Sequence, residues 1–525
     1  MHVVSVSSLS QSLWTYPGST RNSNAFAVFD LSEVHRRMLM LNPTSSLHHS
    51  FQHLNLRTSG LFLILFSLAI ATASAQTFTK LDDFNGANGS TPLGALTQGL
   101  DGNLYGAAHQ GGSVGRCFGA PGCGLIYQAT PTGTIAVMHQ FTGTEGALPS
   151  AAPILGTDGN FYGTALRGGT HTNGTFFQLT PEGSLTSLYN FAGPNGQQPA
   201  GGLTLGWDGS FYGSASQGGA YLQGDIFRVS ATGAYKRLYS FCAQSGCPDG
   251  QVPKDGLALA HDGNFYGVTP AGGANKFGTI FKVTPAGVFT TLYTFCAQTN
   301  CTDGATPNVT LVEGRDGNLY GTTYQGGSHF SGTVFRITRA GVYSILHNFC
   351  SQPGCADGGH PQAGIVLAAD GNFYGTTSDS GAHSRGTIFY VNTQKQFQVV
   401  YSFQASDGQF PAQLMQHTNG TFYGTMQVGG TSGVGTLFSL VYHQAPFVKS
   451  VEMAGKIGST VHIYGQGLTG TADVQFNGKS ATSFTVVSDT EVTAVVPSGA
   501  MTGAIQILVA PSTAYSTNTN FKVLP

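Results

Sequence analysis

Residues 262–267 read Asp-Gly-Asn-Phe-Tyr-Gly, and close variants of this phrase recur along the chain. The tyrosines of the phrase stand at intervals of 49 to 57 residues and are Tyr105, Tyr162, Tyr212, Tyr266, Tyr320, Tyr374 and Tyr423. Repeats of this length are typical of four-stranded propeller blades and are too long for most helical repeats. The seven phrases therefore predict an all-β fold, with a seven-bladed β-propeller over residues 76–441.

Each repeat divides into four short β-type segments separated by glycine-containing turns. In the fourth repeat the segments are 256–259, 264–269, 279–283 and 289–295. Each of the first six phrases carries one aspartate, whereas a calcium loop supplies several oxygens, so we interpret the aspartates as turn residues. Neighbouring Phe and Tyr point to opposite faces of a strand, which predicts that the tyrosines pack between blades. The seventh phrase has Thr418-Asn419-Gly420 in place of Asp-Gly-Asn, which leaves its turn geometry open.

The two ends of the repeat region are predicted to close the ring. Outer-type segments that end in Phe occur at 78–84, 135–141, 185–191, 235–241, 289–295, 343–349 and 397–403. The first of these precedes any complete set of inner strands, and the last inner set, 412–440, has none after it. Residues 78–84 should therefore form the fourth strand of the final blade and remove its exposed edge.

Two resemblances support this domain organisation. The repeats, with Gly-x-Ile-Phe-x-Val-Thr-Pro-x-Gly at 278–287, resemble the GloVer (Gloeo/Verruco) tandem repeat of exported bacterial proteins over about 78–440. That resemblance implies a scaffold without catalytic residues of its own. After the linker Ala445-Pro446, residues 446–525 resemble the IPT/TIG immunoglobulin-like domain through Gly465–Gly467, Phe476–Gly478 and Val496–Gly503. This second resemblance implies a small β-sandwich that serves as a spacer or a protein-contact domain.

Residues 1–75 are interpreted as an N-terminal extension and a signal peptide. The apolar run 61–71 follows Arg57 and precedes Ala73-Ser74-Ala75, which predicts cleavage after Ala75 and translation from Met38 or Met40. The run is about half of the roughly 20 apolar residues that a membrane span needs, so no span is expected in the mature chain. We expect a secreted, periplasmic or cell-surface location.

The eight cysteines form four close pairs, which are Cys117 and Cys123, Cys242 and Cys247, Cys296 and Cys301, and Cys350 and Cys355. An even number of cysteines in close pairs in an exported chain predicts disulfides within single loops. Zinc binding is the alternative, but it would require pairs on different blades to converge, and no suitably placed His completes a set. No metal or other cofactor is expected.

Charge patterning favours binding over catalysis. The 22 Lys and Arg and 24 Asp and Glu form no basic stripe, so nucleic acid is not an expected partner. The segments predicted to lie innermost are uncharged, and they are 96–99, 153–156, 203–206, 257–260, 309–312, 365–368 and 414–416. Asp255, His261, Glu313 and Arg315 lie nearby but are unmatched between repeats, and isolated residues of this kind are more often turn or solvent residues.

Propeller hydrolases and lyases normally present carboxylates and His around the channel, and paired acids can share the proton transfers. The pattern therefore favours a non-catalytic surface or secreted protein that binds a glycan or a protein. A polysaccharide-active hydrolase or lyase with loop-borne acids, and a structural adhesive scaffold, are the alternatives.

The ligand is expected on one face of the propeller. Connections from the second to the third strand, and from the fourth strand to the next blade, emerge on the same side and are long and variable, and such loops often carry function. The candidate binding residues on this face are His109, Arg116, Arg167, His171, Tyr221, Lys254, Lys276, His329, Phe330, His360, His383 and Arg385.

Overall fold

The computed structural model describes residues 76–525, and the predicted signal peptide lies outside the described residues. Regular structure in this part is β-sheet, apart from two short 3-10 helices, η1 (Thr299–Cys301) and η2 (Pro353–Cys355). Residues 76–525 contain no helix that is both long and apolar enough to cross a membrane.

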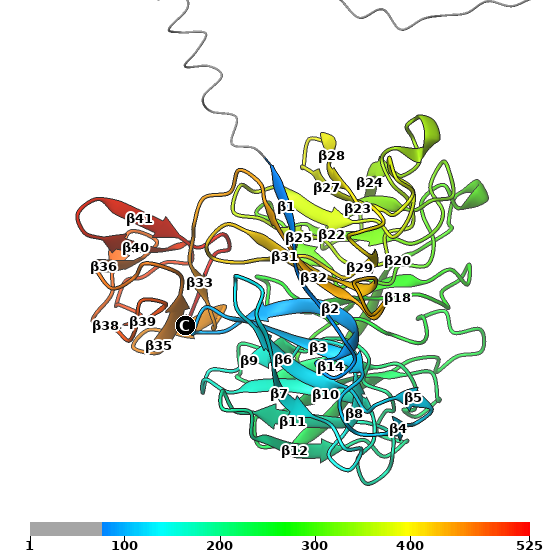
Figure 1. The fold of residues 1–525 in the computed structure, drawn as a ribbon, viewed down its shortest axis with the longest axis horizontal. Helices are drawn as coiled ribbons and strands as arrows, with labels where there is room; N and C mark the ends of the chain where they lie inside the picture. The colour runs from blue at the N-terminus through cyan, green and yellow to red at the C-terminus, as the bar shows by residue number, and fades with distance from the viewer. Residues whose placement is uncertain (1–75) are drawn as a thin grey trace, which may run out of the picture. The chain divides into compact units, whose positions relative to one another are not determined.

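Seven antiparallel sheets in a β-propeller-like arrangement each contain one copy of the phrase (Figure 1). Sheet 1 consists of β2 (Ser90–Gln98), β3 (Leu104–Gln110), β6 (Leu125–Ala129) and β7 (Ile135–Gln140). Sheet 2 consists of β8 (Ala147–Pro149), β9 (Ile154–Leu155), β10 (Phe161–Arg167), β11 (Thr175–Leu179) and β12 (Leu185–Asn190). Sheet 3 consists of β13 (Thr204–Leu205), β14 (Phe211–Ala215), β15 (Asp225–Val229) and β16 (Tyr235–Ser240).

The remaining four sheets of this arrangement follow the same order. Sheet 4 consists of β17 (Ala258–Leu259), β18 (Phe265–Thr269), β19 (Thr279–Val283) and β20 (Phe289–Thr294). Sheet 5 consists of β21 (Val312–Glu313), β22 (Leu319–Thr323), β23 (Thr333–Ile337) and β24 (Tyr343–Asn348). Sheet 6 consists of β25 (Val366–Leu367), β26 (Phe373–Thr376), β27 (Thr387–Val391) and β28 (Phe397–Ser402). Sheet 7 consists of β29 (Gln409–Pro411), β30 (Met415–Gln416), β31 (Phe422–Val428), β32 (Thr436–Val441) and β1 (Thr77–Asp83).

The first strands of neighbouring sheets contact one another. For example, β13 contacts β17, β17 contacts β21, and β21 contacts β25. They therefore surround a common axis, and the fourth strands lie outermost. One end of the arrangement carries the connections from second to third strands and from fourth strands to the next sheet. We call this end the loop face. The other end carries the short turns and is called the turn face. A small hairpin lies on the loop face of sheet 1 and consists of β4 (Arg116–Cys117) and β5 (Ala120–Pro121).

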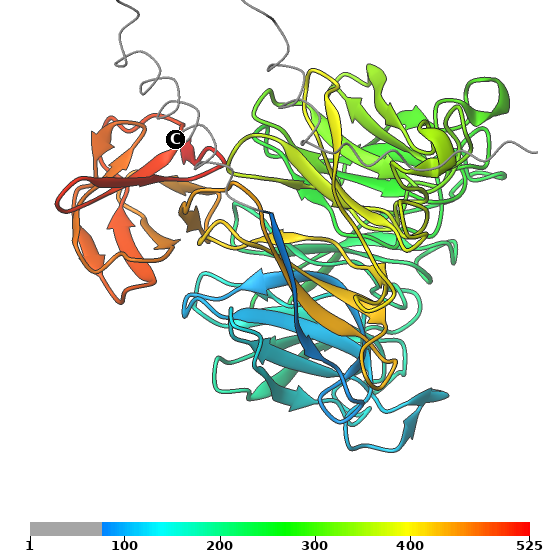
Figure 2. The same cartoon turned by 45° about the horizontal axis from the view of Figure 1, so that its top comes forward.

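The predicted exchange of strands between the chain ends is confirmed. Strand β1 pairs antiparallel with β32 from Thr77 opposite Val441 to Asp83 opposite Thr436. Blue β1 runs beside orange β32 in both views (Figure 1, Figure 2). A second link joins sheets 1 and 7, because the Thr91 amide donates to the Val434 carbonyl at 2.8 Å. The N-terminal strand thus covers an edge of sheet 7 that would otherwise be exposed.

The aspartates and tyrosines of the phrase have the predicted structural roles. Asp262 accepts hydrogen bonds from the Asn264 amide at 3.0 Å and from the Tyr266 hydroxyl at 2.7 Å. The tyrosines are buried, and Tyr212 stacks on Phe265 of the next sheet with ring centroids 3.9 Å apart. A hydroxyl bound to the turn carboxylate satisfies the polar end of a ring whose body packs between sheets.

The seventh phrase keeps this turn with a different residue. Asn419 accepts a hydrogen bond from the Thr421 amide at 2.9 Å, and Gly420 has φ of 92°. The residues that match Asp-Gly-Asn are therefore 419–421. The sequence analysis had matched residues 418–420, one position earlier. The asparagine amide oxygen replaces the carboxylate oxygen in the turn.

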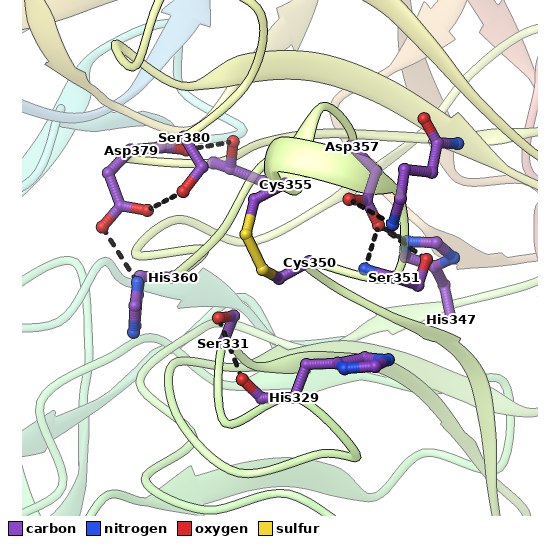
Figure 3. The surroundings of a disulfide bond; sticks show 12 residues. His329, Ser331, His347, Cys350, Ser351, Cys355, Asp357, His360, Asp379 and Ser380 are labelled. Atoms are coloured by element: carbon purple, nitrogen blue, oxygen red, sulfur yellow. Dashed lines mark hydrogen bonds and ion pairs between the residues drawn. A yellow bond between two sulfur atoms is a disulfide. The ribbon is translucent and has the colours of Figure 1, made fainter. Parts of the chain in front are cut away.

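All four cysteine pairs form disulfides within single loops, as predicted. Figure 3 shows the Cys350–Cys355 bridge beside η2. The same loop is held by Asp357, which accepts hydrogen bonds from the Ser351 amide at 3.0 Å and lies 3.0 Å from His347 Nε2. Burial would raise the pKa of this carboxyl, but the hydrogen bonds from His347 and Ser351 lower it to about 2. Asp249 and Asp303 anchor the Cys242–Cys247 and Cys296–Cys301 loops in the same way, so each of these three loops has two restraints.

Replacing Cys350 and Cys355 together with serine should lower the free energy of unfolding by only about 1–2 kcal/mol. The closed loop is very short, so little chain entropy is lost when it is closed, and Asp357 still anchors the loop in the variant. Chemical denaturation of the variant and the wild type under non-reducing conditions measures the difference. A loss as large as that of a core truncation would contradict this view.

The C-terminal domain is a sandwich of two sheets, in agreement with the predicted immunoglobulin-like fold. One sheet has the order β33 (Lys449–Ser450), β35 (Thr460–Tyr464), β39 (Glu491–Val495) and β38 (Phe484–Val486). The other has the order β37 (Lys479–Ser480), β36 (Thr471–Phe476), β40 (Ile505–Val509) and β41 (Thr513–Ser516). A parallel pair, β34 (Ala454–Lys456) and β42 (Lys522–Leu524), completes the domain. Alternate residues of the strands, such as Val461, Ile463 and Val474, form its core.

Candidate functional site

In each of the seven sheets the chain reaches the first strand through the same backbone feature. This feature is a buried proline that follows a residue with positive φ. The prolines are Pro92, Pro149, Pro199, Pro253, Pro307, Pro361 and Pro411. The preceding residues have φ between 50° and 57° and are Thr91, Leu148, Gln198, Val252, Thr306, His360 and Phe410. Non-glycine residues adopt this conformation only where surrounding contacts enforce it.

Hydrogen bonds to the preceding sheet enforce the conformation. The Leu148 amide donates to the Cys123 carbonyl at 2.7 Å, and the His360 amide donates to the Ser331 carbonyl at 2.8 Å. Each link joins the entry of one sheet to the loop between the second and third strands of the sheet before it. The chain is thereby turned toward the axis, and the residues after the proline line that axis on the loop face.

These residues form the mouth of a cavity of about 510 Å³, which we call the axial pocket. A narrower cavity of about 200 Å³ continues from it between the first strands. The axial pocket takes residues from all seven sheets, which are Leu93, Gly94, Ser150, Ala200, Lys254, Asp255, Pro270, Thr306, Asn308, Tyr324, Gln362, Ala363, Gly364, Pro411, Ala412, Gln413 and Gln427. Its size lies within the range of small-molecule sites in proteins.

The wall of the axial pocket differs between its two sides. Sheets 4 to 7 contribute a polar arc, which consists of Lys254, Asp255, Asn308, Gln362 and Gln413. Sheets 1 to 3 contribute what we call the small-residue arc, which consists of the small residues Gly94, Ser150 and Ala200 together with the aliphatic Leu93. A molecule at the axis therefore meets hydrogen-bonding groups on one side and mostly apolar surface on the other.

Asp255 is the one acidic residue among those that line the axial pocket. Its backbone carbonyl accepts a hydrogen bond from Ser214 Oγ at 2.8 Å, which fixes the residue at the neck between the two cavities. A Cβ at position 201 would lie 2.4 Å from the Asp255 backbone, so Gly201 is required for this close approach. Burial raises the pKa of the Asp255 carboxyl to about 7, and the nearby charge of Lys254 limits the rise. The group can thus exist in either protonation state near neutral pH.

Comparison with known proteins places the chain in a family. The Gloeobacter/Verrucomicrobia repeat matches residues 116–329 and 309–482, which together make up more than half of the chain. The chain belongs to the Gloeobacter/Verrucomicrobia repeat family. An IPT/TIG domain matches residues 446–523 and agrees with the C-terminal sandwich. No curated protein matches the sequence.

Solved structures similar to this repeat protein are distant. A putative gluconolactonase is 10% identical with a TM-score of 0.37, over 71% of this chain and 94% of that one. A gluconolactonase from Xanthomonas campestris is 10% identical with a TM-score of 0.36, and the match covers 71% of this chain and 92% of that one. A putative 6-phosphogluconolactonase from Bacteroides fragilis is 18% identical with a TM-score of 0.38, and the match covers 64% of this chain and 94% of that one. Similarity this distant gives no argument about the ligand or reaction of the repeat protein.

Of the twelve binding residues expected on the loop face of the repeat protein, Lys254 alone lines the axial pocket. His360 lies next to the pocket, because its ring centroid is 5.1 Å from that of Tyr324. Its Nδ1 is 2.9 Å from Asp379 Oδ2, and this hydrogen bond raises the pKa of the imidazole (Figure 3). His109 is half-buried with Nδ1 3.1 Å from the Pro149 carbonyl, and burial lowers its pKa.

The other nine expected residues occupy the outer loops or strand ends. His171, Tyr221, His329, Phe330 and His383 are exposed, and Arg167 and Arg385 are half-buried. Arg116 donates to the Gly119 carbonyl within its own loop, and Lys276 donates to the Gly246 carbonyl of the neighbouring disulfide loop, so both are engaged by outer loops. The structure thus does not bring these nine residues into the axial pocket.

The sequence analysis did not identify most residues of the polar arc. The segments predicted to lie innermost begin a few residues after the proline, whereas the wall of the axial pocket begins directly after it. Asn308, Gln362 and Gln413 were therefore overlooked, and Asp255 was interpreted as an isolated turn or solvent residue. The available signal was the proline of each repeat, because the positions that follow it share one register.

The three other charged residues near the inner strands are partnered on the turn face, which corrects their interpretation as isolated residues. His261 Nδ1 is 2.6 Å from Glu313 Oε2, and its Nε2 is 2.9 Å from the Asn520 carbonyl of the C-terminal domain. The hydrogen bond with Glu313 raises the pKa of His261. Arg315 donates to the Ala369 carbonyl at 2.8 Å. His261 thus contacts the C-terminal domain through Asn520, and Arg315 does so through a 3.4 Å hydrogen bond to the Asn518 carbonyl.

A larger cavity of about 800 Å³ adjoins these contacts on the turn face, lined in part by Arg315, Arg339 and Asn518. Two of the side chains that line it have protein partners, since Arg339 pairs with Glu313 and Asn518 donates to the Leu367 carbonyl at 3.1 Å. Within residues 76–525, no group of three or more His, Cys, Asp or Glu is arranged to hold a metal ion.

Proposed function

We propose that this repeat protein is an exported, non-catalytic binding protein that holds a glycan in the axial pocket. In this proposal the seven sheets form one closed seven-bladed propeller, and the signal peptide is removed after Ala75. The disulfides and the IPT/TIG domain support an extracytoplasmic location, because disulfides persist in oxidising compartments.

The composition of the axial pocket is the observation that carries the proposal. Four side-chain amides, those of Asn308, Gln362, Gln413 and Gln427, line it together with Asp255. Amides and carboxylates offer the mixture of donors and acceptors that sugar hydroxyls require. A preformed concave site with few charges suits a small neutral ligand or the end of a glycan chain better than a flat protein surface.

A hydrolase or lyase on this scaffold is the second candidate. The pKa of Asp255, raised to about 7 by burial, suits a general acid or base. Glycoside hydrolysis normally requires two carboxylates that flank the scissile bond, and the residues lining the axial pocket include one. Binding is therefore the function that the geometry supports better.

Replacing Ala200 with tryptophan should abolish glycan binding, because the new ring would fill the mouth of the axial pocket. Residues 76–525 of the wild type and the variant would be screened on a glycan array, and hits would be titrated by calorimetry. The matched control is Ala286→Trp, which introduces the same side chain in an exposed turn on the turn face. We expect at least a tenfold loss of affinity for Ala200→Trp and none for Ala286→Trp. Unchanged binding by Ala200→Trp would place the ligand elsewhere.

A further inference from the structure

The polar arc contains hydrogen-bonding groups that the protein leaves unused. Asp255 Oδ2 and Asn308 Oδ1 are buried and have no hydrogen-bond partner within the described part of the chain. Both residues line the axial pocket, on neighbouring sheets. A buried polar atom without a partner costs free energy, and one on a residue that lines a cavity can recover that cost by bonding to a ligand there.

We propose that the axial pocket holds one neutral pyranose unit, with Asp255 and Asn308 hydrogen-bonded to its hydroxyls and the small-residue arc against its C–H face. This inference rests on the glycan-binding function proposed above and specifies the chemistry of the ligand. A pyranose ring presents hydroxyls around its edge and C–H groups on its face, and the two arcs of the pocket match these two surfaces.

The charges at the pocket favour a neutral ligand over an ion. A calcium ion takes six to eight oxygen ligands, usually with several carboxylates, whereas Asp255 stands alone beside the cationic Lys254. An anionic ligand would be attracted by Lys254 but would meet the Asp255 carboxylate at the neck of the pocket. Hydroxyls can donate to a carboxylate and accept from an amide without adding charge.

Binding should depend on the protonation of Asp255. Lys254 and Tyr324 are the other titratable residues that line the axial pocket. Among the residues that line the narrower cavity, Asp255 is the one titratable residue. An ionised carboxylate accepts stronger hydrogen bonds from hydroxyls than a protonated one. A bound pyranose would therefore lower the pKa of Asp255 from about 7, and affinity should rise as the pH passes upward through that value.

The test is calorimetric titration of residues 76–525 with the methyl pyranosides of glucose, galactose, mannose and xylose, and with calcium chloride and sodium glucuronate as ionic probes. At least one neutral pyranoside should bind, with an affinity that rises about tenfold across the pKa of Asp255. Asn308→Ala should weaken binding about tenfold, and Asp255→Asn, which preserves shape, should weaken binding and remove the pH dependence. Gln506→Ala, at an exposed position of β40 in the C-terminal domain, should change neither property.

The outcomes separate this inference from the proposed function. If no methyl pyranoside binds at its solubility limit, or if calcium or glucuronate binds instead, the pyranose assignment is overturned. If a pyranoside binds with no dependence on pH in the wild type, the role of Asp255 is overturned. If glycans from the array bind equally well to Ala200→Trp, the proposed function itself is wrong. Circular dichroism of each variant confirms that a loss of binding does not reflect unfolding.

Discussion

A chain that starts at Ala87 instead of Gln76 is expected to lose the cooperative unfolding transition of its repeat region. The deletion removes β1, so that β32 becomes an unpaired edge along its whole length. It also removes Phe78, which stacks on Tyr401 with ring centroids 4.3 Å apart, and the fully buried Phe84. Truncating one buried Phe costs about 3–5 kcal/mol, and whole domains are stable by only about 5–15 kcal/mol.

Differential scanning calorimetry of the shortened chain measures this effect. Phe84→Ala in the chain 76–525 should show part of this effect, a loss of about 3–5 kcal/mol. The reason is that the ring packs against Tyr127 with centroids 5.1 Å apart. Thr79→Ala, at an exposed position of the same strand, is the matched control and should change stability little. An unchanged melting temperature after the deletion would show that β1 does not close the ring.

Replacing Asp225 with threonine is expected to stabilise the protein substantially at neutral pH. Asp225 begins β15, is fully buried, and has no hydrogen-bond partner for either carboxylate oxygen within residues 76–525. Threonine occupies the matching position in five other sheets, as Thr175, Thr279, Thr333, Thr387 and Thr436. In sheet 4 the hydroxyls of Thr279 and Thr269 lie 2.9 Å apart, whereas Asp225 faces Ala215.

The expected gain depends on pH in a defined way. Burial raises the pKa of Asp225 from 3.8 to about 8, and the charge of Arg237 offsets only part of the rise. Between those two values the folded chain must keep a proton that the unfolded chain releases. This costs about 1.4 kcal/mol per pH unit, so stability falls as the pH rises from about 4 to about 8. Asp225→Thr should remove this slope and add roughly 4 kcal/mol at about pH 7.

Urea unfolding of the wild type and Asp225→Thr at about pH 5 and about pH 8 tests the prediction, since the difference between the two proteins should grow with pH. Thr279→Asp is the reciprocal control, because it places the same carboxyl at the matching position of sheet 4 and should destabilise that sheet. Equal stability of the wild type and Asp225→Thr at both pH values would mean that the carboxyl is not held in its neutral form.

Features that repeat within each unit could be predicted from the sequence. The turn role of Asp262, the burial of Tyr266 and the disulfides of loops such as 350–355 depend on residues a few positions apart. The pairing of β1 with β32 could also be predicted, because counting strand types showed an extra outer strand at one end and a missing one at the other. Local turn and strand preferences, repeated seven times, carry enough information for these conclusions.

The candidate site depended on the tertiary structure. Asp255 and Asn308 are unremarkable within their own repeats, and their meaning appears only when all seven sheets contribute residues to one pocket. The burial of Asp225 beneath Gly196 and the contact of His261 with Asn520 likewise join segments from different parts of the chain. Solvent exposure, unpaired hydrogen-bonding groups and shifted pKa values are set by every atom around a side chain, and these atoms come from segments that are distant in the sequence.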